Sequence, residues 1–216
     1  MNWKINFNIN DIIVRKDWKF LIRNFLPVNI ADSFSFSEGM KIVGNLTKAA
    51  ADEIVRDGFI ADLMRDFTVN LMIILRAKYT KEWEEDWKNE AFLGISCASV
   101  YREEEAFHYI KSAYEKLDDP PQSLLLAYIN SGRSSDHFLT KEEIVHLTER
   151  ALQKGVTYET ASRMAFLASD EGNQKKCNYW EQAALEAEAK KLHTPFIIPN
   201  VLKKIVEVEN GYQYED

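Results

Sequence analysis

The sequence predicts an all-α protein, in which an N-terminal helical unit is followed by a short solenoid of antiparallel helix pairs. Three observations lead to this prediction. The 216 residues include only 8 Gly and 5 Pro, which is few for a sandwich or barrel with many tight turns. Apolar residues recur at the three- and four-residue spacing of amphipathic helices from about residue 11 to residue 192. Small residues return every 33–38 residues in the second part of the chain, the period of two-helix repeats.

The first predicted segment is the N-terminal unit, residues 1–80. Apolar and polar side chains alternate over residues 3–9, so a short strand competes there with an extended tail. The helices that follow carry an apolar stripe, and Asp11 and Pro27 mark the two ends of the first one. The expected helices of this unit span about 11–26, 37–58 and 60–79.

The second segment, residues 81–192, alternates short helices with breaks such as Asp118-Asp119-Pro120-Pro121. Its expected helices span 81–100, 103–117, 121–131, 140–154, 157–170 and 173–192. The third segment, residues 193–216, should hold a short helix at about 200–206. A hairpin around Asn210-Gly211 competes there with a frayed tail, so short strands stay open at both termini. We expect the three segments to form one compact domain.

An internal repeat accounts for the residue types of the second segment. Ala91-Phe92-Leu93 returns as Ala127-Tyr128-Ile129 and as Ala165-Phe166-Leu167. A small residue lets the two helices of a pair approach closely, and the larger residue beside it fills the gap to the next pair. This pattern predicts three helix pairs stacked one on the next.

The third of these pairs resembles a tetratricopeptide repeat. Met164-Ala165 stands where that family has Leu-Gly, Gly172-Asn173 matches its tight turn, and Ala184 matches its closing alanine. The resemblance covers about residues 81–192 and is degenerate. Ala161 replaces the family's Trp, and the closing Pro is missing. The resemblance implies a concave wall formed by the first helix of each pair.

Charge is unevenly distributed along the chain, whose net charge is −7. Residues 1–80 carry 11 Lys/Arg and 9 Asp/Glu, whereas residues 81–216 carry 16 and 25. A negative field repels phosphate backbones and steers basic proteins, so we expect a protein partner rather than nucleic acid. A solvated surface that keeps molecules apart is the alternative. Neither a membrane-spanning run nor a secretory signal is visible, so we expect no membrane partner and a cytoplasmic location.

Two Glu-x-x-His motifs are the sharpest candidates for metal chemistry. Glu105 with His108, and Glu143 with His146, each place two ligand types on one helical face, as in di-iron bundles. The two motifs are 38 residues apart, which is the repeat step, so inheritance of the repeat explains them without a metal. We therefore expect neither a metal nor a cofactor.

Nucleophilic chemistry has weaker candidates. Cys97 lies in an apolar stretch, where burial makes a thiol inert, and Cys177 stands alone. The run Gly132-Arg-Ser-Ser-Asp-His137 contains the residue types of a catalytic triad, but one short loop cannot supply triad geometry. We accordingly expect no catalytic residues and a protein that is not an enzyme.

The leading interpretation is a non-enzymatic protein-binding module. In size, charge and architecture the chain is similar to all-helical immunity proteins of bacterial polymorphic toxins, which implies that it neutralises a cognate, basic toxin domain. A repeat-type adaptor, chaperone or regulator is the first alternative, and a helical di-metal enzyme using the Glu-x-x-His pairs is the second. The predicted partner-binding residues on the concave wall are Glu85, Lys88, Phe92, Tyr128, Glu159, Phe166 and Asp170. The three aromatic side chains could instead belong to the core.

Overall fold

The computed structural model describes residues 9–133, 138–205 and 213–215. These residues contain twelve α-helices and one short 3₁₀ helix, and the only β pairing among them is a single bridge, so the all-α prediction is confirmed. The described chain divides into two compact units. Unit 1 comprises residues 9–86 and 204–205, and unit 2 comprises residues 87–203 and 213–215.

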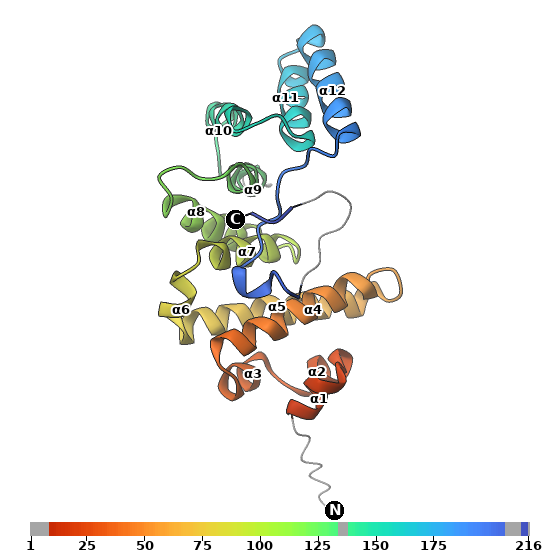
Figure 1. Cartoon of the computed structure of the whole chain (residues 1–216), viewed down its shortest axis with the longest axis vertical. Helices are drawn as coiled ribbons and strands as arrows, with labels where there is room; N and C mark the ends of the chain where they lie inside the picture. The colour runs from red at the N-terminus through yellow and green to blue at the C-terminus, as the bar shows by residue number, and fades with distance from the viewer. Residues whose placement is uncertain (1–8, 134–137, 206–212, 216) are drawn as a thin grey trace, which may run out of the picture. The chain divides into compact units, whose positions relative to one another are not determined.

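Unit 1 is built around two long antiparallel helices, α4 and α5, with α3 and α2 packed on α5 (Figure 1). Its helices are α1 (Ile9–Arg15), α2 (Trp18–Asn24), α3 (Pro27–Ser33), α4 (Phe36–Glu53), α5 (Gly58–Lys78) and α6 (Thr80–Glu84). Fully buried apolar side chains from α2 to α6 form its core, among them Leu21, Ile30, Met40, Leu46, Leu71, Leu75 and Trp83.

The start of unit 1 differs from the sequence prediction, because the helix expected over 11–26 is broken. Lys16 has a φ of 57°, a left-handed conformation that ends α1. Asp17 then caps α2, its carboxylate accepting a hydrogen bond from the Phe20 amide. Pro27 is the first residue of α3, a position at which proline needs no amide hydrogen, so this proline begins a helix as well as ending the run before it.

Unit 2 consists of three helix pairs. Its helices are α7 (Trp87–Ala98), α8 (Glu103–Glu115), α9 (Gln122–Gly132), α10 (Lys141–Gln153), α11 (Tyr158–Asp170) and α12 (Gln174–Ala189). Within the pairs α7 packs on α8, α9 on α10 and α11 on α12, and further contacts join α8 to α9 and α10 to α11 (Figure 1). The first helices α7 and α9 also touch each other.

After α12, the residues that the structure describes are largely non-helical. A 3₁₀ turn, η1 (Asn200–Leu202), replaces the longer helix expected at about 200–206. The only β contact among the described residues is a parallel bridge between Phe196 and Tyr214. The strand expected over 3–9 lies outside the described residues except for its last residue, which begins α1, and the hairpin turn at Asn210-Gly211 lies wholly outside them. None of the described helices combines the length and apolarity that a membrane crossing requires.

The close approach of α7 and α8 depends on Gly94. A Cβ added at this position would lie 2.9 Å from the Ala106 carbonyl oxygen and 3.0 Å from the Ile110 amide nitrogen. Both are backbone atoms and cannot turn aside as a side chain can. The absence of a side chain at Gly94 therefore sets the spacing of the first helix pair.

We predict that Gly94→Ala lowers the free energy of unfolding by about 1–3 kcal/mol, because the added methyl group forces two packed helices apart. Chemical denaturation followed by circular dichroism measures this loss. Gly58→Ala is the matched control, since a Cβ there meets nothing within 4 Å. A Gly94→Ala protein as stable as the control would contradict the close-packing account.

Candidate protein-binding groove

The C-terminal segment of unit 2 is anchored where the first helices of two pairs begin. The Thr194 amide donates to the Glu159 carboxylate (2.8 Å), and the Thr194 hydroxyl donates to the side-chain oxygen of Gln122 (3.1 Å). The hydroxyls of Thr157 and Thr194 also share a hydrogen bond of 2.9 Å. Gln122 begins α9 and Thr157 caps α11, so Thr194 joins the starts of both helices.

Gln122 extends this network into the end of α10. Its amide nitrogen donates to the carbonyl oxygens of Ala151 and Gly155, at 2.8 Å each. Gln122 is buried, so these bonds satisfy polar groups that water does not reach. One side chain thus connects the second helix pair to the C-terminal segment.

His193 lies beside this anchor and is almost completely buried. Its Nδ1 is 3.1 Å from Glu159 Oε1 and its Nε2 is 3.4 Å from Glu188 Oε2. The imidazole therefore bridges the start of α11 and the end of α12. Together, His193 and Thr194 use both carboxylate oxygens of Glu159.

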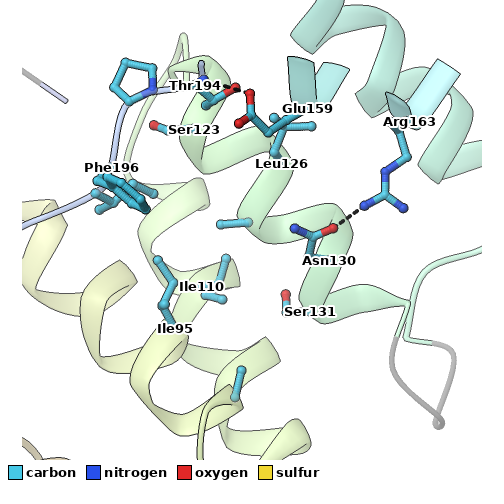
Figure 2. A pocket seen from close by; sticks show the side chains of 14 residues that line it. Ile95, Ile110, Ser123, Leu126, Asn130, Ser131, Glu159, Arg163, Thr194 and Phe196 are labelled. Carbon is cyan, nitrogen blue, oxygen red and sulfur yellow. Dashed lines mark hydrogen bonds between the residues drawn. The ribbon is translucent and has the colours of Figure 1, made fainter. Parts of the chain in front are cut away.

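A cavity of about 360 Å³ opens next to the anchor (Figure 2). Its floor is apolar and includes the buried side chains of Ile110 and Leu126. Figure 2 shows Phe196 of the C-terminal segment on one side of the cavity and Arg163 of α11, hydrogen-bonded to Asn130 of α9, on the other. We call this cavity the α9–α11 groove. It is lined by Ile95, Ala98, Ile110, Ser123, Leu126, Ala127, Asn130, Ser131, Glu159, Arg163, Thr194, Pro195, Phe196 and Ile197.

One face of α11 continues from the groove. Glu159, Arg163, Phe166 and Asp170 follow each other at steps of four, three and four residues, so they lie on a single side of the helix. The Arg133 guanidinium lies 4.3 Å from the centre of the Phe166 ring, a cation–π contact. Phe166 is nevertheless 45% exposed, and Asp170 is exposed.

The structure therefore brings three of the predicted partner-binding residues, Glu159, Phe166 and Asp170, to one surface. Sequence analysis missed Arg163, although it stands one turn after Glu159 and one turn before Phe166 on the same face. That helical spacing was the signal that could have found it.

The other four predicted residues do not join this surface. Glu85 is exposed at the end of α6 and belongs to unit 1. Lys88 is only 2% exposed, and its ammonium donates to the Glu215 carbonyl oxygen. Phe92 and Tyr128 are each 8% exposed, which agrees with the core placement that sequence reasoning kept open for these rings.

Tyr128 belongs to the core of unit 2. Its ring stacks on Tyr114, with centroids 4.7 Å apart, and on Phe107, with centroids 5.5 Å apart. Burial, reinforced by Tyr114, Glu115 and Glu143, raises the pKa of Tyr128 to about 12. Sequence analysis left this placement open, because a tyrosine hydroxyl is compatible with either a core or a wet edge.

Three of the four Glu-x-x-His residues, Glu105, His108 and Glu143, make local contacts at the starts of their helices. The Glu143 carboxylate accepts from the Thr140 amide (2.7 Å) in a capping box, and these hydrogen bonds lower the pKa of Glu143. In the other motif Glu105 lies 3.6 Å from Arg102, while His108 faces Glu104 at 3.8 Å. Across the described ranges, His, Cys, Asp and Glu side chains form no group of three that could hold a metal ion.

Both cysteines lie in surroundings that suppress thiolate formation. Burial, with a smaller contribution from Glu105, raises the pKa of Cys97 to about 12. Burial and the nearby Glu181 carboxylate raise the pKa of Cys177 as well. A catalytic thiol needs the opposite shift.

Comparison with protein-family models, with curated proteins and with solved structures yields no match to this chain.

We predict that Cys97 reacts about a thousandfold more slowly with iodoacetamide at pH 8 in the folded protein than in the urea-unfolded chain. A rise in pKa from 9 to about 12 lowers the thiolate fraction by about that factor. Mass spectrometry of alkylated peptides measures both rates. Alkylation of folded Cys97 at the unfolded rate would show that the thiol is accessible and that its ionisation is not suppressed.

We predict that Tyr128→Ala costs about 3–5 kcal/mol of stability, because it removes a ring that stacks on two others. Tyr128→Phe keeps the ring and should cost far less. A Tyr128→Ala protein that melts like the wild type would place the ring outside the core.

Comparison of the wild type with Tyr128→Phe at different pH values tests the ionisation of the Tyr128 hydroxyl. Because the folded pKa is above the unfolded value, the stability contribution of the neutral hydroxyl is complete below pH 10 and is lost between pH 10 and about 12. Tyr128→Phe should lose less stability than the wild type across that window.

Proposed function

We propose that the chain is a non-enzymatic protein-binding module whose α9–α11 groove receives part of a partner protein. The observation that carries this proposal is the combination of an apolar floor with a charged and aromatic rim. Arginine and aromatic side chains are enriched at the centres of interfaces. Arg163 and Phe196 line the groove, and Phe166 lies on the same face of α11, one turn beyond Arg163. The half-exposed Phe166 ring offers apolar area that a partner would remove from water.

We further propose that the partner is a basic toxin domain and that the protein acts in the cytoplasm as its immunity protein. The excess of 25 acidic over 16 basic residues across positions 81–216 supports this, since such a field attracts a basic partner and speeds its association. Binding at a rigid helical surface could neutralise a toxin without any chemistry on the part of this chain. The exposed Asp170 on the face of α11 would meet a basic side chain of the partner.

An adaptor or chaperone that binds peptides is the second candidate. The observation in its favour is that unit 2 already holds a non-helical stretch of its own chain, residues 194–198, through main-chain and side-chain hydrogen bonds. A surface that holds one such segment is chemically suited to hold another.

The immunity proposal requires that a neighbouring gene encode a toxin-like protein; that protein, inactivated for purification, is the partner for the test. We predict that Arg163→Glu and Phe166→Ala each weaken its binding at least about tenfold, the loss expected when an interface anchor is removed. Lys111→Glu on α8 and Tyr179→Ala on α12 are matched controls, because neither residue lines the groove. Isothermal titration calorimetry measures the four affinities.

Added salt should slow association more than it speeds dissociation, as steering by surface charge requires. In cells, the wild type should restore growth against the active toxin, and the two groove variants should not. Full affinity in both groove variants would overturn the proposed surface. Failure of the wild type to bind any such protein, together with tight binding of extended peptides at the groove, would replace the immunity role with the adaptor role.

A further inference from the structure

We propose that the part of unit 2 now covered by residues 213–215 is a binding position for an extended acidic segment of a partner protein, and that the chain's own C-terminal segment competes for it. We call this position the Lys88 site; it consists of Lys88, Ser123 and the backbone of Phe196. This proposal rests on the proposed function, because it requires that a partner protein bind on this side of unit 2.

The Lys88 site recognises both the backbone and a carboxylate of its occupant. The Lys88 ammonium donates to the Glu215 carbonyl oxygen (2.7 Å), and the Ser123 hydroxyl donates to the Glu215 carboxylate (2.5 Å). Phe196 pairs with the occupant through its own backbone. Its amide donates to the Gln213 carbonyl oxygen (2.7 Å), and its carbonyl oxygen accepts from the Glu215 amide (2.9 Å). Three of these four bonds are to main-chain atoms of the occupant, and the Ser123 bond selects an acidic side chain.

Both side chains of the site are built into unit 2. Lys88 is 2% exposed and Ser123 is 5% exposed, and both project from the first helices of their pairs. Lys88 also donates to the Asn200 side chain at 3.3 Å. A buried ammonium group strongly favours oxygen ligands, so a segment that replaces residues 213–215 must also offer it an oxygen, and a carboxylate near Ser123 makes the stronger hydrogen bond.

The present occupant is held in a way that permits exchange. Its β pairing is a single bridge rather than a ladder of strands, and Gln213 is exposed while Tyr214 and Glu215 are only half-buried. Such short pairings open easily compared with helices of a packed core. Because residues 213–215 belong to the same chain as the site, their effective concentration at the site is high, and a partner segment must bind tightly enough to displace them.

The Lys88 site and the α9–α11 groove share Phe196. The backbone of Phe196 pairs with residues 213–215, while its side chain lines the groove and is 47% exposed. Ser123 belongs to both sites as well. A partner segment that crosses the groove can therefore continue into the Lys88 site once residues 213–215 leave it.

The probe is a fluorescent peptide of residues 209–216, Glu-Asn-Gly-Tyr-Gln-Tyr-Glu-Asp, with both ends blocked. The protein is the full-length chain carrying Glu215→Lys, which removes the carboxylate from the internal competitor and places a positive charge near Lys88. Fluorescence anisotropy should show that this variant binds the peptide at least about tenfold more tightly than the wild type, because the internal segment competes less well. A peptide with Lys at the position of Glu215 should bind at least about tenfold more weakly.

A second substitution in the Glu215→Lys background tests the site itself. Ser123→Ala should weaken peptide binding about tenfold, as loss of a hydrogen bond to a charged group requires. Ser96→Ala on α7 is the matched control, since that hydroxyl bonds within its own helix to the Phe92 carbonyl. Circular dichroism confirms that each variant is folded.

The inference is overturned if the Glu215→Lys protein binds the peptide no better than the wild type, or if Ser123→Ala and the control behave alike. The proposed function has a separate test: it is overturned if Arg163→Glu and Phe166→Ala bind the partner protein as tightly as the wild type does. If those two variants do weaken partner binding but the peptide results are negative, only the Lys88 site is overturned.

Discussion

The hydrogen bonds that converge on Thr194 determine how the binding side of unit 2 is built. Thr194 meets the Gln122 side chain at the start of α9 and the Thr157 hydroxyl and Glu159 carboxylate at the start of α11. Each such bond contributes about 0.5–1.5 kcal/mol, and leaving a buried partner unsatisfied costs more. Because Gln122 also binds two carbonyl groups at the end of α10, the network fixes the C-terminal segment relative to two helix pairs.

This anchor has two consequences for the surface. It places Phe196 beside the apolar floor of the α9–α11 groove, and it directs the chain toward the position where Glu215 covers Lys88 and Ser123. The first helices of the pairs consequently present one open region and one covered region. A protein that binds in the open α9–α11 groove can extend into the covered Lys88 site. In the proposed mechanism, binding of the partner and displacement of residues 213–215 therefore occur together.

Local sequence signals predicted the helices well because their causes are local. Apolar spacing marked α5 and the helices of unit 2, and caps such as Thr140 and Thr157 lie within three residues of the groups that they bind. The break at Lys16 was missed because a lysine in a left-handed conformation has no reliable sequence signal.

Only part of the candidate site could be predicted, because the sequence reveals local spacing but not contacts between distant residues. The face of α11 follows from helical spacing alone, so Glu159, Phe166 and Asp170 were found. The burial of Lys88 follows from a contact with a residue 127 positions away, and the anchor joins Gln122 and Thr194 across 72 positions. Periodicity within one helix carries no information about such distant partners.

Amide hydrogen exchange measured residue by residue with NMR tests the central claim most directly, which is that Thr194 anchors the C-terminal segment to α9 and α11. The amides of Thr194 and Phe196 each donate a hydrogen bond in the structure, to the Glu159 carboxylate and to the Gln213 carbonyl. We expect the Thr194 amide to exchange at least about 100-fold more slowly than in an unstructured peptide, and the Phe196 amide to be protected but less so. Exchange of Thr194 at the unstructured rate, while the amides inside α9 and α11 stay protected, would contradict the account.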